Sequence, residues 1–161
     1  MSRKIAMLPG TFDPPTLGHL DIIKRGAALY DKLYVVVADN VAKKTLFSSA
    51  ERKQMLEELL SEFPNIEVRI WDKLVVDFAK ANDVGVILRG VRAMNDFGYE
   101  FELAVSYKQM YPDVEVLFIP TNPEYFLVRS SAIKEMAAFG ADISKMVPPM
   151  VVRRVDEKIK C

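Results

Sequence analysis

Cysteine and histidine are nearly missing from this chain, which has one residue of each among 161. Cys161 is the only cysteine, so an intramolecular disulfide is impossible and a cysteine cluster that binds a metal is excluded. With His19 as the one histidine, the composition also argues against a structural zinc site.

Long hydrophobic runs and an excess of one charge are also missing. No apolar run approaches the roughly 20 residues that cross a bilayer. The run from Ile5 to Leu8 is ended by Gly10, too early for a signal-peptide core, so we expect a cytoplasmic protein with no membrane partner. The 22 basic and 22 acidic residues cancel, so no overall field favours nucleic acid. An anionic ligand must therefore be bound by locally concentrated positive charge.

Short β-branched segments alternate with longer amphipathic ones, which is typical of parallel βαβ units. Strands are predicted at residues 4–8, 33–38, 66–70, 84–88 and 114–119. Helices are predicted at 17–29, from 48 to before Pro64, at 74–82, 95–110 and 130–139, and from about 149 onward. The pattern predicts α/β class: a single doubly wound, Rossmann-like domain over residues 1–161, with a five-stranded parallel sheet and helices on both faces.

Two of the predicted helices have clear local signals. Ser48 and Glu51 form a capping box at the start of the second helix. Its apolar residues fall on one stripe at helical spacing and are predicted to be core: Met55, Leu56, Leu59, Leu60 and Phe63. The helix at 95–110 has an apolar face made of Phe97, Phe101, Leu103, Ala104 and Tyr107.

Ligands of a doubly wound sheet bind beyond the carboxyl ends of its strands. The first loop in such a place runs from Gly10 to His19 and contains Pro14-Pro15. Gly10 permits a sharp turn, and Thr16, Gly18 and His19 lie at the helix start, where free amides and the helix dipole favour a phosphate. The alternative is an ordinary βα turn in which Asp13 and Thr16 cap the helix and His19 packs on an apolar face.

The ten residues from Gly10 to His19 resemble the signature of the nucleotidylyltransferase superfamily. In that signature Gly-x-Phe-Asp-Pro is followed by a [His/Thr]-x-Gly-His element. The motif is long, and it lies between a strand and a helix as the superfamily requires. The resemblance therefore favours nucleotide transfer over the ordinary turn.

Basic residues mark two further loops. Lys43-Lys44 follows the second strand, and its placement makes phosphate contact and a solvated basic loop about equally reasonable. Arg89 and Arg92 flank Gly90 and Val91 at the end of the fourth strand, where guanidinium groups suit bidentate contacts with phosphate. Ion pairing of these arginines with Asp96 or Glu100 is the alternative.

Residues 89–100, Arg-Gly-Val-Arg-Ala-Met-Asn-Asp-Phe-Gly-Tyr-Glu, resemble one family in particular, the bacterial phosphopantetheine adenylyltransferases. Thr16 and the chain length fit the same family, and the resemblance extends from Lys4 to about Val152. Three positions depart from the family pattern. Arg129 replaces a hydroxyl residue of a serine-rich run, Leu8 stands where an aromatic residue is usual, and Leu17 stands in place of asparagine.

The resemblance implies transfer of the adenylyl group of ATP to 4′-phosphopantetheine, with dephospho-coenzyme A and pyrophosphate as products. It implies that His19 stabilises the transition state, with Lys43 and Arg92 as further catalytic residues. Thr11, Lys43, Val75 and Arg89 would bind the acceptor. The implied ATP site comprises Thr11, Phe12, His19, Gly90, Val91, Arg92, Glu100, Tyr125, Phe126, Leu127, Val128, Arg129, Ser130 and Ser131.

Mg²⁺ is expected to bridge phosphate oxygens of ATP, because no carboxylate cluster forms a protein cage for it. The family also implies a homohexamer and feedback binding of coenzyme A. The alternatives are a nicotinamide-mononucleotide adenylyltransferase or a cytidylyltransferase, a nucleotide-binding module without catalysis, and a purely structural interaction domain.

Overall fold

A five-stranded sheet forms the centre of the computed structural model, which describes residues 4–39 and 44–160. The strands are β1 (Ile5–Gly10), β2 (Lys32–Ala38), β3 (Ile66–Trp71), β4 (Val86–Val91) and β5 (Glu115–Pro120). They pair in parallel in the order β3-β2-β1-β4-β5. The chain winds outward from β1 to β3 and then returns to the other side of β1, so the order reverses between β1 and β4.

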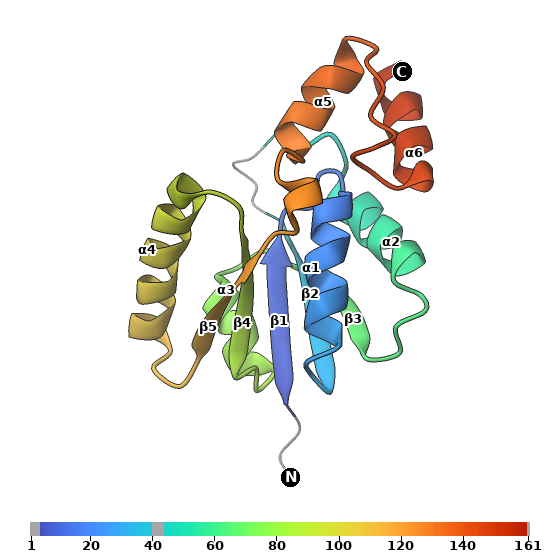
Figure 1. Ribbon diagram of the computed structural model, residues 1–161. Helices are drawn as coiled ribbons and strands as arrows, with labels where there is room; N and C mark the ends of the chain where they lie inside the picture. Colours follow the sequence, from blue (N-terminus) through green and yellow to red (C-terminus); the bar gives the residue numbers. More distant parts are fainter. Residues whose placement is uncertain (1–3, 40–43, 161) are drawn as a thin grey trace.

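Helices cover both faces of this sheet (Figure 1). On one face α1 (Leu17–Ala27) and α2 (Ser49–Leu59) pack against side chains such as Leu33, Val35 and Val37. On the other face α3 (Val75–Ala81) and α4 (Met94–Met110) pack against Tyr34 and Val36. Successive side chains of β2 thus point to opposite faces of the sheet and pack in different cores, as the period of two along a strand requires. Because helices cover both faces, β2 is apolar along most of its length.

The last two helices form a smaller layer beyond the carboxyl ends of the strands (Figure 1). A 3₁₀ turn at Pro123–Tyr125 leads to α5 (Ser130–Ala138), and α6 (Pro149–Lys160) follows. Their apolar faces share a third core with Phe47 and Met55, so this layer is attached through the start of α2. None of the helices in the described parts of the chain is long and apolar enough to cross a membrane.

The predicted α/β class, parallel sheet and two-sided helix cover are confirmed. The capping box also forms, since Ser48 accepts from the Glu51 amide and Glu51 accepts from the Ser48 amide. Several boundaries differ from the prediction: β1 continues to Gly10 instead of ending at Leu8, β4 begins at Val86 instead of Val84, and α1 ends at Ala27 instead of Leu29. The fourth strand was predicted to end at Leu88, but β4 continues through Arg89 and Gly90 to Val91, because these residues pair with Phe118–Pro120 of β5.

Candidate active site

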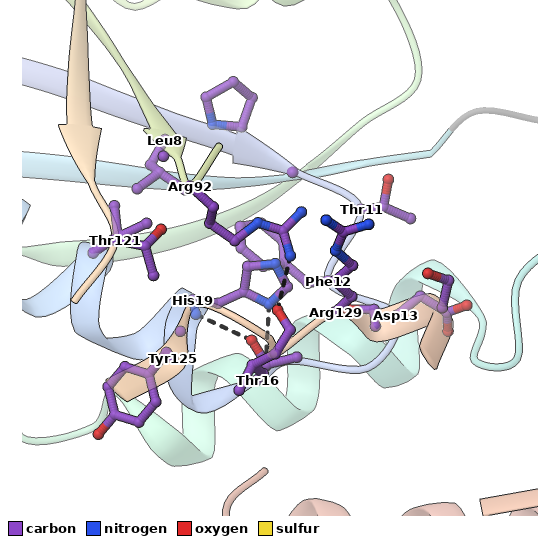
Figure 2. A pocket seen from close by; sticks show the side chains of 18 of the residues that line it. Leu8, Thr11, Phe12, Asp13, Thr16, His19, Arg92, Thr121, Tyr125 and Arg129 are labelled. Carbon is purple, nitrogen blue, oxygen red and sulfur yellow. Dashed lines mark hydrogen bonds between the residues drawn. The ribbon is translucent and has the colours of Figure 1, made fainter. Parts of the chain in front are cut away.

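A cavity of about 640 Å³ opens beyond the carboxyl ends of β1 and β4, at the point where the strand order reverses. It is bordered by the turn after β1, the end of β4 and the segment leading into α5 (Figure 2). The lining residues are Leu8, Pro9, Gly10, Thr11, Phe12, Asp13, Thr16, Gly18, His19, Ile22, Lys44, Thr45, Arg89, Gly90, Arg92, Glu100, Thr121, Tyr125, Val128, Arg129, Ser130, Ser131 and Lys134.

Thr16 and His19 form a reciprocal cap at the start of α1. The His19 amide donates to Thr16 Oγ1 at 3.1 Å, and the Thr16 amide donates to His19 Nδ1 at 3.1 Å. Nδ1 is therefore an acceptor, and a neutral imidazole must carry its proton on Nε2. Thr16 does cap the helix, as the alternative interpretation of this turn proposed. His19 nevertheless lines the cavity with a defined N–H donor.

The His19 imidazole is neutral at physiological pH. Desolvation in the cavity wall, followed by repulsion from the Arg92 guanidinium, lowers the pKa of His19 from 6.5 to about 4. A neutral imidazole cannot contribute a full positive charge. It can donate one hydrogen bond from Nε2, and the Arg92 guanidinium supplies positive charge nearby.

Phe12 orients the turn between β1 and α1. Its backbone is left-handed, with φ 52°, and its side chain is only 1% exposed, with the ring at 5.0 Å from the His19 ring. A Cβ on Gly10 would lie 2.9 Å from Cζ of this ring. A glycine is therefore needed at position 10 because the Phe12 ring lies too close for a side chain. The prediction was that Gly10 is needed to allow a sharp turn of the backbone.

Asp13 connects the same turn to two other segments. Its buried carboxylate accepts from the amides of Leu46 and Phe47 at 2.8 and 2.9 Å. The third donor is Lys134 Nζ on α5, at 2.9 Å. Asp13 thus does not cap α1, contrary to the alternative interpretation of the turn. It fixes the position of α5 relative to the β1 turn.

Arg89 and Glu100 form a close ion pair at the edge of the cavity. Nε and Nη2 of Arg89 donate to the two carboxylate oxygens at 2.5 and 2.7 Å, and Nη1 donates to the Pro9 carbonyl at 3.1 Å. This contact raises the pKa of Arg89 despite its burial. The ion-pairing alternative therefore holds for Arg89. Three of its five N–H donors are used, which leaves two for a ligand.

Arg92 joins the β4 end to the segment before α5. Its Nε donates to Asp96 at 3.2 Å and its Nη1 donates to the Val128 carbonyl at 3.0 Å. The expected alternative, a pair with Asp96, is therefore present as well. Figure 2 shows the guanidinium extending toward His19, in agreement with its effect on the histidine pKa.

The structure brings most of the predicted site residues to one cavity, but not all of them. Val91, Phe126 and Leu127 do not line it, although each adjoins a residue that does. Val75 is the first residue of α3 and packs with Trp71 in the second core, also outside the cavity lining. Lys43 lies outside the described residues, whereas its neighbour Lys44 lines the cavity.

Sequence reasoning missed Arg52, a fully buried residue on α2. Its Nη1 donates to the carbonyls of Thr11 at 2.7 Å and Ala38 at 3.2 Å, and its Nε donates to that of Phe47 at 3.1 Å. Asp39 Oδ1 lies 3.4 Å from Nη2. Arg52 thus connects the loops after β1 and β2 to the start of α2. A signal was present, because the residue lies one turn before Met55 and Leu56 on the core-facing side of the helix.

A parallel α/β sheet with a cation-lined cavity at its switch point defines a doubly wound protein of the Rossmann-like class, in which ligands bind at that point. The sequence model of the cytidylyltransferase-like family matches residues 7–136. A crystal structure of a Vibrio parahaemolyticus protein assigned as a nicotinate-nucleotide adenylyltransferase has the same fold. Its TM-score is 0.71 at 16% identity, over 98% of this chain and 94% of that one.

Two curated relatives narrow this class to a family. The phosphopantetheine adenylyltransferase of Caldanaerobacter subterraneus subsp. tengcongensis is 46% identical over 98% of each chain. The enzyme of the same name from Dictyoglomus thermophilum is 45% identical over 95% of this chain and 93% of its own. The chain belongs to the phosphopantetheine adenylyltransferase family.

Proposed function

We propose that this chain transfers the adenylyl group of ATP to 4′-phosphopantetheine and so makes dephospho-coenzyme A and pyrophosphate. Family membership supports the reaction. Within the site, the main support is the hydrogen bond from the Thr16 amide to His19 Nδ1. This bond leaves the proton of the neutral imidazole on Nε2, which lies in the cavity near the Arg92 guanidinium.

The reaction needs no general base. A phosphate oxygen of the acceptor, already ionised at neutral pH, attacks the α-phosphorus of ATP. The bond to the β-phosphate breaks, and pyrophosphate leaves with the electron pair. Catalysis therefore depends on positioning two anions and on stabilising charge at the α-phosphoryl group. Neutral His19 would donate from Nε2 to a non-bridging α-phosphate oxygen, and Arg92 would supply positive charge beside it.

The remaining residues divide between the two substrates. Thr11 and the two free donors of Arg89 would bind the acceptor phosphate, with Lys43 as a further predicted contact and Val75 as the predicted contact of the pantetheine arm. ATP would lie along Phe12, Gly90 to Arg92, and the segment from Tyr125 to Ser131. Glu100 would act through its bond to Arg89, by holding that guanidinium in place.

Mg²⁺ would enter with ATP and neutralise part of the charge of its phosphates. The cavity fits this arrangement because its two carboxylates are already bound, Asp13 to Lys134 and Glu100 to Arg89. Within residues 4–39 and 44–160, no three histidine, cysteine, aspartate or glutamate side chains are grouped to hold a metal. The ion is therefore proposed as part of the nucleotide substrate.

We also propose a homo-oligomer, and the surface of α4 supports it. None of its 17 residues is buried, and Phe97, Phe101 and Val105 follow one another at intervals of four on its exposed apolar face. A contiguous apolar patch of this kind is typical of an interface. The number six rests on family resemblance, and light scattering of the purified chain measures it. Feedback binding of coenzyme A and a cytoplasmic location stay predictions.

The test of the proposed function is pyrophosphate release with ATP or CTP and a series of acceptors. We expect release only with ATP and 4′-phosphopantetheine, with dephospho-coenzyme A identified by mass spectrometry. Release with nicotinamide mononucleotide, or with CTP, would replace this function by one of the related transfers. No release with any pair, even in a single turnover, would indicate a nucleotide-binding module without catalysis.

A further inference from the structure

Arg52 completes a ring of contacts around Phe12, the residue of the β1–α1 turn whose backbone is left-handed. Its Nη1 donates to the Thr11 carbonyl at 2.7 Å, and its Nε donates to the Phe47 carbonyl at 3.1 Å. The Phe47 amide donates in turn to the Asp13 carboxylate at 2.9 Å. The residues before and after Phe12 are therefore both attached to one buried guanidinium, the first directly and the second through Phe47.

The backbone of Phe12 has a conformation that a bulky residue rarely adopts. Its φ is 52°, where the Cβ of an L residue is crowded, and its side chain is only 1% exposed. Such a conformation is unfavourable by itself and persists only where neighbouring contacts hold it. The contacts through Arg52 supply that restraint. Phe12 also lines the cavity, with its ring 5.0 Å from that of His19, and strained backbone of this kind is concentrated at functional sites.

The bond from Arg52 also determines where the Phe12 amide points. The Thr11–Phe12 peptide is trans, so its carbonyl and its N–H point in opposite directions. Because the Thr11 carbonyl is directed at the buried guanidinium, the Phe12 N–H is directed away from it. Among the acceptors of residues 4–39 and 44–160, this amide has no hydrogen-bond partner. It is therefore an N–H donor available to a ligand of the cavity.

The hydrogen bonds of Arg52 are mainly with carbonyl oxygens. Its side chain is 1% exposed, whereas Asp39, whose carboxylate lies 3.4 Å from Nη2, is 41% exposed. Burial of a charged group is unfavourable, so a cation in this position is poor evidence for a role in stability alone. An arginine differs from an apolar residue here because its rigid fork of donors fixes the direction of several peptides at once, those of Thr11, Ala38 and Phe47.

We propose that Arg52 is a positioning residue for adenylyl transfer. Through the Thr11 carbonyl it holds the Phe12 amide as an N–H donor, beside His19 Nε2, for the phosphoryl group that is transferred. This inference rests on the proposed adenylyl transfer. A backbone amide that is fixed in advance stabilises developing charge well, because it needs no reorganisation during the reaction. Arg52 itself lies outside the cavity lining and acts only through this peptide.

The test compares Arg52→Lys with the unmodified chain. Lysine keeps the positive charge but cannot bind the Thr11 and Phe47 carbonyls with the same rigid fork. The kcat for adenylyl transfer should fall about tenfold or more, because the Phe12 amide is no longer held in place. The KM values for ATP and for 4′-phosphopantetheine should change by less than about threefold, since the donor acts mainly in the transition state.

Leu33→Ala is the matched control for a loss of stability. Leu33 is fully buried at the amino end of β2, outside the cavity lining, so its truncation destabilises the core without touching the site. All variants are assayed at a temperature at which circular dichroism shows them folded. Leu33→Ala should keep the kcat of the unmodified chain. An equal fall of kcat in the two variants would reduce Arg52 to a purely structural residue and overturn the inference.

A second measurement needs no turnover. In the unmodified chain and in Leu33→Ala, the NMR resonance of the Phe12 amide should shift when α,β-methylene-ATP binds, a nucleotide that cannot transfer its adenylyl group. In Arg52→Lys at saturating nucleotide this shift should be lost. The inference is overturned if the shift is the same in Arg52→Lys, if kcat is unchanged there, or if only a KM changes. Failure of the proposed function would appear instead as no pyrophosphate release by the unmodified chain.

Discussion

The Thr16 amide and the His19 imidazole are joined by a hydrogen bond of 3.1 Å that determines which imidazole nitrogen carries the proton. This bond lies within the first turn of α1. A second bond runs in the opposite direction, since Thr16 Oγ1 accepts from the His19 amide. A capping box usually has glutamate or glutamine at this position. Here histidine takes that place and also lines the cavity, so one residue both begins the helix and presents a donor to the ligand.

Replacement of His19 tests that donor directly. His19→Ala removes the proposed contact with the α-phosphate, and kcat for adenylyl transfer should fall about a hundredfold or more. The KM for 4′-phosphopantetheine should change little, because the acceptor is assigned to other residues. Single-turnover and steady-state rates measure both effects. A kcat within about threefold of the unmodified enzyme would contradict the role assigned to His19.

The pKa of His19 can be measured without interference, since the chain has no other histidine. Nitrogen NMR should show a neutral ring protonated on Nε2, titrating near pH 4 instead of 6.5. His19 should therefore cause no inflection in kcat/KM between about pH 5 and 8. An inflection near pH 6.5 that is lost in His19→Gln would contradict the proposed neutral state.

The same pKa shift predicts how stability depends on pH. The unfolded chain binds a proton at His19 near pH 6.5, whereas the folded chain binds it only near pH 4. Stability from this group is therefore fully present above pH 6.5 and is lost as the pH falls toward 4. Urea unfolding at a series of pH values measures the effect. His19→Gln, which has no titrating ring, should show a weaker pH dependence in this window, and an unchanged dependence would refute the assignment.

Thr16 should contribute to stability through its cap. Thr16→Val keeps the shape of the side chain and removes the oxygen that accepts from the His19 amide. Loss of such a cap should lower the free energy of unfolding by about 1 kcal/mol. Thr16→Ser keeps the oxygen and is the matched control. Equal stability of the two variants would show that the cap contributes nothing.

Arg52 should contribute strongly to the stability of the folded state. Arg52→Met would leave the carbonyls of Thr11, Ala38 and Phe47 without this donor, which should lower the free energy of unfolding by on the order of 3 kcal/mol. Arg154→Met is the control, because that residue has only a surface pair with Glu58 at 3.6 Å and should change stability by less than about 1 kcal/mol. Similar losses for the two variants would contradict the structural role of Arg52.

Features that depend on neighbouring residues were predictable from the sequence. The capping box of Ser48 and Glu51 forms within one turn, and the apolar stripe containing Met55 and Leu56 enters the core as its helical spacing indicates. The parallel sheet followed from alternating strand and helix patterns. The turn from Gly10 to His19 also lies where a strand passes into a helix, and for that reason it predicted the position of the site.

Pairing across the sheet and contacts between distant segments were decided only by the tertiary structure. Arg89 and Gly90 have a loop-like sequence, yet they belong to β4 because β5 supplies backbone partners. The burial of Arg52 depends on carbonyls that are up to 41 residues away in sequence. Local periodicity determines which face of an element is apolar, but only the packed chain determines which donors and acceptors meet, because those contacts join residues with no fixed sequence spacing.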